Sequence, residues 1–338
     1  MSRRVETRRI DGRGEDRAAP AVSLCVPTFN GERYLEECLR SVLAQTEADL
    51  EVLIVDDGST DATPRMACEA AADDDRIRVY RNERNLGLVG NWNRCVELAR
   101  GEWIKFVFQD DLVAPRCVAA LRAAAGERFD LAACMRDFEF EAGIDPGTER
   151  YYRTHPTLDS VFGGVGAVDA ATFQAAVLEH LGFNFVGEPT AVLFRREAWL
   201  RTGPFNADLV AICDFEFWAR IGVHSGLAAV SEPLATFRVH AGAESARNNA
   251  ERFYRMTELD QVVLMHEYAF QPVFAPLREA ARRAGVRLDA RCAMRAARAR
   301  SLSRSDPALQ AQYAHIAALY PAIERAPNVI SRVKGWFG

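Results

Sequence analysis

LEVLIVDD at residues 50–57 decides the fold. Its centre, VLIV, is an unbroken apolar run, which is typical of a parallel strand covered on both faces. AVSLCVP (21–27) is a second short apolar run, and IRVYRN (77–82) and EWIKFVFQDD (102–111) are two further predicted strands. Apolar residues between these runs recur at helical spacing, for example over residues 34–43. The alternation predicts an α/β fold with a doubly wound, mostly parallel sheet.

The composition is that of a globular protein. Hydrophobic residues make up 49% of the 338 residues and charged residues 26%, which excludes a disordered or fibrous chain. No apolar run reaches the roughly 18 residues of a membrane span, and the Arg-rich start lacks the apolar segment of a signal peptide. The eight cysteines include no CxxC pair, which argues against a disulfide framework. We therefore expect a cytoplasmic protein.

Charge divides the chain into three parts. Residues 1–20 carry six Arg and four acids and are expected to form a flexible tail. Residues 21–250 contain 22 basic and 35 acidic residues and are expected to form the main domain. This acidic part excludes nucleic acid as a partner, because such binding depends on phosphate neutralisation, and it suits a bound cation. Residues 251–338, with 14 basic and 8 acidic residues, predict a helical basic C-terminal region.

Polar side chains follow three of the predicted strands. The clusters are Thr28-Phe29-Asn30, Asp56-Asp57 and Asp110-Asp111. Ligands of doubly wound sheets bind beyond the carboxyl ends of the strands, so the three clusters predict one site at that edge. A carboxylate such as Asp57 can accept hydrogen bonds from a nucleoside ring N–H or from ribose hydroxyls. The alternative role is to cap the next turn.

The pair Asp110-Asp111 predicts a cation. Two adjacent carboxylates repel each other unless an ion neutralises them, and hard ions such as Mg²⁺ or Mn²⁺ prefer oxygen ligands. Capping of the following helix is the alternative, and both roles can hold at once. His240 follows another predicted strand, where it can bind a metal or serve only the structure.

These motifs together resemble family 2 of the glycosyltransferases. The segments that carry the resemblance are VSLCVPTFNGERYLEECLRSVLAQT, VLIVDDGSTDAT and NERNLGLVGNWNRCVELARGEWIKFVFQDD, supported later by GEPTAVLFRR, CDFEFWARI and FRVHAGAES. The resemblance covers about residues 21–245. It implies a GT-A fold and a hexosyltransferase that takes a sugar from a nucleotide-sugar, with UDP the expected nucleotide. It also implies inversion at the anomeric carbon.

The resemblance implies a nucleotide site as well. The residues that match it are Pro27, Phe29, Asn30, Glu32, Asp56, Asp57 and Asp110. Phe29 is expected to stack on the uracil ring and Asp57 to bind the base, with Asp56 in support. Asn30 and Glu32 belong to the same motif, and their roles stay open.

The resemblance further implies a metal site and a catalytic base. Asp110 and Asp111 match the end of a DxD-type motif that holds Mn²⁺ or Mg²⁺, and His240 matches a residue that joins the metal or the diphosphate. Asp214 matches the base that accepts the proton of the acceptor hydroxyl. Glu216, two residues later, is a weaker rival for that role.

Two positions depart from the family pattern. Phe108 stands where the DxD-type motif has its first acid, and Cys213 stands where a carboxylate usually precedes the base. These departures keep open the alternative of a non-catalytic nucleotide-sugar-binding or scaffold protein on the same fold. The chain lacks both a glycine-rich turn after the first strand and a GxxxxGK[ST] motif, which excludes a dehydrogenase and a P-loop enzyme.

The basic C-terminal region leaves two alternatives. Residues 278–304 hold nine Arg and two acids. Of these Arg, three share one helical stripe: Arg287, Arg291 and Arg295. The sequence ends near Trp336-Phe337. Peripheral contact with the anionic inner face of the plasma membrane would bring the site to a lipid-linked glycan. Such glycans are common acceptors for bacterial members of the family that build surface polysaccharides. The alternative is a helical cap whose Arg side chains pair with acidic groups.

Overall fold

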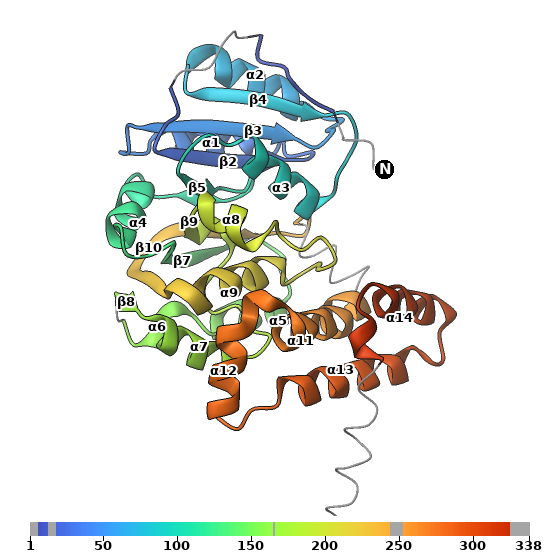
Figure 1. Ribbon diagram of the computed structural model, residues 1–338. Helices are drawn as coiled ribbons and strands as arrows, with labels where there is room; N and C mark the ends of the chain where they lie inside the picture. The colour runs from blue at the N-terminus through green and yellow to red at the C-terminus, as the bar shows by residue number, and fades with distance from the viewer. Residues whose placement is uncertain (1–5, 13–17, 165, 244–252, 325–338) are drawn as a thin grey trace, which may run out of the picture. The chain divides into compact units, whose positions relative to one another are not determined.

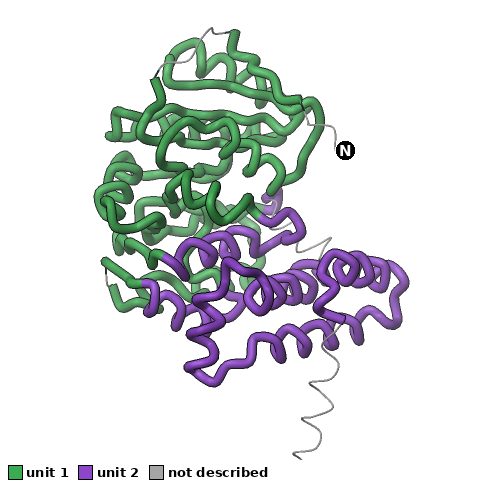
Figure 2. The backbone as a smooth tube through the Cα atoms, in the orientation of Figure 1, with its two compact units in different colours: residues 1–169, 184–205, 225–240 green, residues 170–183, 206–224, 241–338 purple. Residues whose placement is uncertain are grey.

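The computed structural model describes residues 6–12, 18–164, 166–243 and 253–324, and Figure 1 labels its elements. The chain divides into two compact units (Figure 2). The first unit comprises residues 1–169, 184–205 and 225–240, and the second comprises 170–183, 206–224 and 241–338. This division differs from the predicted boundary at residue 250, because two earlier helical segments belong with the C-terminal helices.

The first unit is built on one sheet, to which the described residues contribute ten strands. The strands are β1 (Thr7–Arg9), β2 (Val22–Thr28), β3 (Leu50–Asp56), β4 (Ile77–Asn82), β5 (Trp103–Phe106), β6 (Leu112–Val113), β7 (Leu131–Phe140), β8 (Ala167–Val168), β9 (Val192–Arg195) and β10 (Leu227–Val239). Their order is β1-β4-β3-β2-β5-β9-β7-β10-β6, with β8 paired to β10. Strands β4, β3, β2 and β5 are parallel, which confirms the predicted sheet.

The strand directions bring several carboxyl ends to one edge of the sheet. β9 runs antiparallel to both β5 and β7, so β7 has the direction of β5. β10 is parallel to β7. The carboxyl ends of β2, β3, β5, β7 and β10 therefore lie along the same side of the sheet, perpendicular to its edge strands. This side is here called the carboxyl rim. Ligands of such sheets bind at this rim.

Helices cover both faces of the sheet (Figure 1). The first unit contains α1 (Leu35–Leu43), α2 (Thr63–Asp73), α3 (Leu88–Leu98), α4 (Cys117–Ala125), α5 (Pro146–Thr154), α6 (Leu158–Phe162), η1 (Pro189–Ala191) and α8 (Arg196–Thr202). The strand order reverses at β2, so right-handed crossovers put α1 and α2 on one face and α3 on the other. The buried strand residues Val52 and Ile54 belong to the core on the face that α1 and α2 cover.

The N-terminal segment corrects one prediction. Thr7–Arg9 form β1, which pairs antiparallel with β4 at the edge of the sheet. Asp11 extends the attachment, because its Oδ2 accepts a hydrogen bond from the Val79 amide at 3.0 Å. The prediction of a flexible tail is therefore wrong for this stretch. An edge strand held by backbone and polar contacts needs no apolar run, so hydrophobic patterning could not indicate it.

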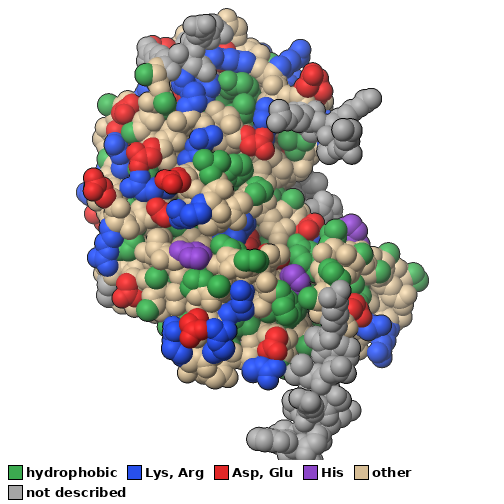
Figure 3. Space-filling model, viewed as in Figure 1, with side chains coloured by type: hydrophobic (Ala, Val, Ile, Leu, Met, Phe, Trp, Pro, Cys, Tyr) green, Lys and Arg blue, Asp and Glu red, His purple; other side chains and the backbone are tan. Residues whose placement is uncertain are grey.

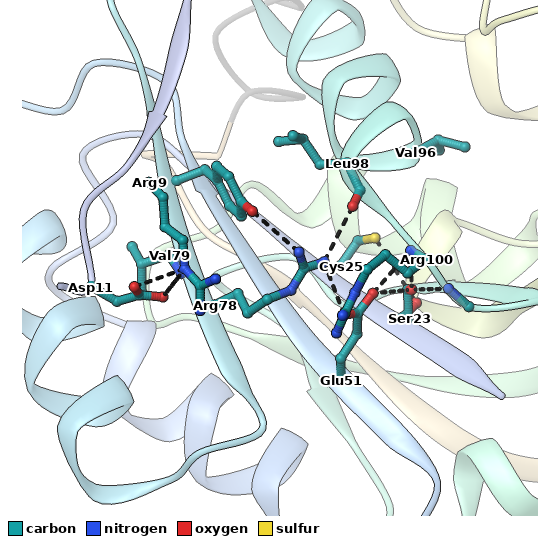
Figure 4. Close-up of polar contacts among 12 residues, drawn as sticks. Arg9, Asp11, Ser23, Cys25, Glu51, Arg78, Val79, Val96, Leu98 and Arg100 are labelled. Carbon is teal, nitrogen blue, oxygen red and sulfur yellow. Dashed lines mark hydrogen bonds and ion pairs between the residues drawn. The ribbon is translucent and has the colours of Figure 1, made fainter. Parts of the chain in front are cut away.

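A buried polar cluster closes the amino-terminal end of the strands (Figure 4). Glu51, which interrupts the apolar run of β3, accepts a hydrogen bond from Ser23 Oγ at 2.6 Å. Its Oε2 lies 2.9 Å from Arg78 Nη2 and 2.7 Å from Arg100 Nη2. The cluster links β2, β3, β4 and the turn before β5 at the end opposite to the carboxyl rim.

The second unit is helical in its described residues. Its elements are α7 (Ala170–Glu179), α9 (Cys213–Ser225), η2 (Arg255–Leu259), α11 (Asp260–Phe270), η3 (Pro272–Phe274), α12 (Ala275–Arg283), α13 (Leu288–Ser303), α14 (Pro307–Leu319) and η4 (Pro321–Ile323). Helices α11 and α13 pack together. Within the described ranges of the chain, every helix is too short or too polar to cross a bilayer.

Candidate functional site

Two loops at the carboxyl rim hold each other in place. Asn30, after β2, adopts a φ of 48°, in the left-handed region that asparagine tolerates better than most residues. Its Oδ1 accepts a hydrogen bond from the Thr60 amide at 2.8 Å, and Glu32 Oε2 accepts one from the Ala62 amide at 2.9 Å. The side chains of Asn30 and Glu32 thus connect the loop after β2 to the loop after β3 through hydrogen bonds to backbone amides.

Gln109 fixes the backbone of Phe29. Its Oε1 accepts a hydrogen bond from Phe29 N at 2.9 Å, and its Nε2 donates to Phe29 O at 3.1 Å. Gly31 permits this approach, because a Cβ at that position would lie 2.1 Å from Gln109 Oε1. Phe29 as a residue stays 37% exposed. Sequence reasoning missed Gln109, and its place next to Asp110 was the available signal.

The two carboxylates after β3 have different surroundings. Asp57 is buried, and its Oδ1 accepts hydrogen bonds from Asn82 Nδ2 and the Leu86 amide, both at 2.8 Å. Burial raises the pKa of Asp57, and the hydrogen bond from Asn82 opposes that shift. Asp56 is also buried, with its Oδ2 3.3 Å from Arg81 Nε. Asp56 therefore serves the structure, whereas Asp57 is held by neutral partners.

Two asparagines support Asp57 and were missed by sequence reasoning. Asn82, at the end of β4, donates its Nδ2 to Asn91 Oδ1 at 3.0 Å. Asn91, on α3, donates its own Nδ2 to the Val55 carbonyl at 2.9 Å. Pro27, buried in β2, lies opposite Val55 in the strand pairing. The position of Asn82 at a strand end was the one signal that the sequence offered.

Asp110 and His240 meet at the carboxyl rim. His240 Nε2 lies 3.0 Å from Asp110 Oδ2. The His240 ring packs on Tyr34 with ring centroids 4.5 Å apart, and Tyr34 Oη contacts Glu141 Oε1 at 3.4 Å. Burial raises the pKa of Tyr34. His240 Nδ1 is buried and finds no hydrogen-bond partner among the described residues.

Asp111, which the sequence predicts as a metal ligand, has both carboxylate oxygens bound within the protein. It is buried, its Oδ2 accepts a hydrogen bond from Thr190 Oγ1 at 2.6 Å, and its Oδ1 accepts one from the Arg238 amide at 3.1 Å. Burial raises its pKa well above the ordinary value. Asp111 therefore fastens the loop after β5 to β10 and η1.

Phe108 belongs to an aromatic cluster. Its ring stacks on Trp92 with centroids 5.0 Å apart and an interplanar angle of 26°. Phe106 and Phe205 pack against the same Trp92 ring. The position of the first acid in a DxD-type motif is therefore filled by an apolar contact, and Phe108 cannot supply a metal ligand.

The remaining pair fits a divalent cation. In the part of the chain that the structure describes, no three His, Cys, Asp or Glu side chains form a metal-binding group. Asp110 and His240 nevertheless present a carboxylate oxygen and an imidazole nitrogen side by side, and Mn²⁺ and Mg²⁺ routinely complete their coordination with phosphate oxygens and water. When bound, the ion would supply positive charge for a leaving diphosphate.

Asp214 lies in the second unit, in the first turn of α9. Its Oδ1 accepts a hydrogen bond from the Phe215 amide at 2.6 Å. Glu216 is buried, its Oε2 lies 2.7 Å from Arg220 Nη2, and burial raises its pKa to about 7. Glu216 is therefore paired with Arg220 in the interior of the second unit, whereas Asp214 is buried less completely, at 8% exposed.

Comparison with known proteins gives relatives along most of the chain. Residues 23–176 match the family described as "Glycosyl transferase family 2". The protein MT1568 of Mycobacterium tuberculosis is 33% identical over 70% of this chain and 72% of its own length. A glycosyltransferase of Haemophilus influenzae is 26% identical over 69% of this chain and 70% of its own.

Solved structures agree on the fold. TarS of S. aureus in complex with UDP-GlcNAc matches with a TM-score of 0.59 at 20% identity, over 90% of this chain and 82% of that chain. The mannosyltransferase PcManGT from Pyrobaculum calidifontis, in complex with GDP-Man and Mn²⁺, matches with a TM-score of 0.53 at 19% identity, over 96% and 87%. With its GT-A type of fold and these relatives, the chain belongs to family 2 of the glycosyltransferases.

Proposed function

We propose that the protein is a metal-dependent, inverting glycosyltransferase that moves a sugar from a UDP-sugar to a glycan or lipid-linked glycan on the cytoplasmic side of the membrane. One observation carries the proposal. Phe29, Asp57 and the Asp110–His240 pair lie at the carboxyl rim of one sheet, within one compact unit. A nucleoside diphosphate needs an aromatic face, a hydrogen-bond acceptor and a cation site, and these residues supply all three.

The base is assigned to Phe29 and Asp57. The exposed Phe29 ring offers a stacking face, and Gln109 holds its backbone. Ionised Asp57 accepts a hydrogen bond from the N3–H of uracil, while Asn82 and the Leu86 amide hold the carboxylate from the protein side. The UDP-GlcNAc bound by TarS supports a uridine nucleotide here.

The diphosphate and its cation are assigned to Asp110 and His240. Their 3.0 Å contact puts two metal ligands together, while Phe108 and Asp111 are used by the fold. The Mn²⁺ in the PcManGT complex supports a divalent ion in this protein.

Asp214 is assigned as the base. In this proposal its carboxylate takes the proton of the acceptor hydroxyl as that oxygen attacks C1 of the sugar. The attack comes from the face opposite to the diphosphate, so a single displacement inverts the anomeric centre. No covalent enzyme intermediate is needed, in contrast to retaining hydrolases.

Purified protein tests the proposal with a panel of UDP- and GDP-sugars in Mn²⁺, with nucleotide release and sugar transfer as the readouts. We expect UDP to bind more tightly with Mn²⁺, Asp110→Ala to lose that gain, and Asp214→Asn to bind UDP but not transfer. Asp73→Ala, at an exposed position on α2, is the matched control. Equal UDP affinity in EDTA would contradict the metal role. Binding without turnover of any donor would favour the non-catalytic alternative.

The acceptor proposal includes contact with an anionic membrane. Of the nine Arg in 278–304, five form ion pairs: Arg282, Arg283, Arg287, Arg298 and Arg300. The surface in Figure 3 likewise shows acidic and basic side chains interspersed. The membrane contact is therefore assigned to the exposed face of α13 that carries Arg291, Arg295 and Met294, the last 62% exposed. Trp336-Phe337 lie outside the described residues.

Vesicle sedimentation tests this contact. Intact protein should pellet with vesicles that contain anionic lipid, and salt should reduce the pelleted fraction. Arg291→Glu with Arg295→Glu should abolish it, while Arg282→Glu, at an exposed and already paired position on α12, should preserve it. Protein that stays in the supernatant at low salt would establish the helical cap instead.

A further inference from the structure

Strand β1 carries a hydroxyl, that of Thr7, which contacts Asn82, the residue that donates a hydrogen bond to Asp57. Thr7 Oγ1 donates a hydrogen bond to Asn82 Oδ1 at 2.8 Å. Arg94 Nε, on α3, donates to the same Thr7 Oγ1 at 2.8 Å. Thr7 precedes residues 23–176, which match the family.

These contacts form a series of hydrogen bonds that begins at Arg94 and ends at the Val55 carbonyl. The groups at its two ends determine the direction of each hydrogen bond in it. Arg94 Nε–H can only donate, so the Thr7 hydroxyl accepts from it and points its own proton at Asn82. At the other end, the Val55 carbonyl can only accept. Asn91 therefore turns its amide nitrogen to Val55 and its oxygen to Asn82.

Asn82 is fixed between these two ends. Its oxygen faces Thr7, and its nitrogen donates to Asn91 Oδ1 and to Asp57 Oδ1. Asn82 is only 2% exposed, so water cannot replace a missing partner. Without the Thr7 proton, either the amide oxygen is buried without a donor, or the amide rotates and turns that oxygen against the Asp57 carboxylate.

We propose that Thr7 is a positioning residue for nucleotide binding, which acts by orienting the Asn82 amide that holds Asp57 toward the base. The inference rests on the proposed function, in which Asp57 binds the base. It gives the N-terminal strand a role in the site, although none of its residues is assigned to contact the nucleotide.

The arrangement also predicts a pH effect. The charged or titratable groups around Asp57 are Asp56 on β3, Arg81 on β4, and Arg94 and Cys95 on α3. Burial raises the pKa of Asp57, and the Asn82 hydrogen bond opposes this shift. Because the ionised carboxylate binds the base, a weaker Asn82 contact should move the acid-side loss of affinity to higher pH.

The test measures UDP affinity of the full chain by calorimetry, in Mn²⁺, over a range of pH. Thr7→Val keeps the shape and strand propensity of the residue but removes the hydroxyl, and we expect affinity to fall about fivefold, as for loss of one hydrogen bond. The pH below which UDP affinity is lost should be higher in Thr7→Val than in the wild type. Thr7→Ser, which keeps the hydroxyl, should restore both readouts. If Thr7→Val does not fold, Thr7→Ala removes the same hydroxyl and gives the same readouts.

A double-mutant cycle with Asp57→Asn separates the outcomes. In the Asp57→Asn background, Thr7→Val should have almost no further effect on UDP affinity. If Asp57→Asn weakens UDP binding but Thr7→Val does not, the inference about Thr7 is wrong and the proposed function stands. An equal loss from Thr7→Val in both backgrounds also overturns it, since Thr7 would then act without Asp57. Unchanged affinity in Asp57→Asn itself would refute the assignment of Asp57 to the base.

Discussion

Gln109 is expected to control nucleotide affinity through the backbone of Phe29. Gln109→Ala removes two hydrogen bonds, of 2.9 and 3.1 Å, that hold Phe29 N and O. Each contributes about 1 kcal/mol net, so the freed loop should cost about 1–2 kcal/mol of binding. That corresponds to about 5- to 30-fold weaker UDP. Because Phe29 is exposed, Gln109→Ala should make the loop after β2 less ordered without destabilising the core.

Gln45 provides a matched control. Its Nε2 donates to the Ala114 carbonyl at 2.8 Å and its Oε1 accepts from the Val118 amide at 3.1 Å, so it bridges backbone groups as Gln109 does. It lies just beyond the end of α1, away from the carboxyl rim. We expect Gln45→Ala to lower the thermal midpoint and leave UDP affinity unchanged. We expect Gln109→Ala to weaken UDP binding and leave the thermal midpoint unchanged.

Gly31 supplies a second check on the same contact. A Cβ there would strike Gln109 Oε1 at 2.1 Å, so Gly31→Ala should displace the Gln109 side chain and weaken UDP in the wild-type background. In Gln109→Ala the obstructing atoms are gone, and Gly31→Ala should add little. Additive losses, or a Gln109→Ala variant that binds UDP normally and only unfolds earlier, would refute the reasoning.

Three further predictions concern carboxylates. Glu51→Gln leaves Arg78 and Arg100 without their counter-charge and should lower the free energy of unfolding by about 3 kcal/mol in urea titrations, with UDP binding kept by the folded protein. Glu216 has a pKa raised from 4.5 to about 7, so across that interval the folded chain holds a proton that the unfolded chain has released. Stability should therefore fall as pH rises through it, and Glu216→Gln should flatten this slope in thermal melts at several pH values. Asp111→Asn should keep most of the Mn²⁺-dependent gain in UDP affinity, whereas Asp110→Asn should lose it; equal losses would contradict the structural role of Asp111.

The parts of the fold that the sequence predicted depend on local signals. The apolar runs located β2 and β3, because a strand buried on both faces needs apolar side chains at successive positions. Polar clusters at the strand ends indicated Asp57 and Asp110, because parallel strands bring their carboxyl ends to one edge.

Other features could not be read locally. β7 (Leu131–Phe140) begins as a buried run and ends as alternating charged and aromatic residues, so no single periodicity indicates it. β1 is polar and depends on its partner strand β4. Asn82 and Gln109 act through groups that are distant in sequence, and an amide side chain alone does not reveal which backbone or carboxylate it will bind.

Each acidic pair at the carboxyl rim divides its roles in the same way. One member is committed to the fold: Asp56 pairs with Arg81, and Asp111 receives the Thr190 hydroxyl and the Arg238 amide. The other member contacts a neutral or titratable group, with Asn82 at Asp57 and His240 at Asp110.

The division follows from the contacts of each side chain. Asp57 directly follows β3, whereas Asp110 and Asp111 lie in the turn between β5 and β6. Asp56 is committed to the fold by a salt bridge, and Asp111 by hydrogen bonds to both of its carboxylate oxygens. In the proposed site the neutral Asn82 amide suits Asp57, because it orients the carboxylate without cancelling the charge that a base N–H must find. The adjacent acids of the sequence therefore do not form one four-carboxylate site. Asp56 and Asp111 support the fold, and the proposed function assigns the other two, Asp57 and Asp110, to the ligand.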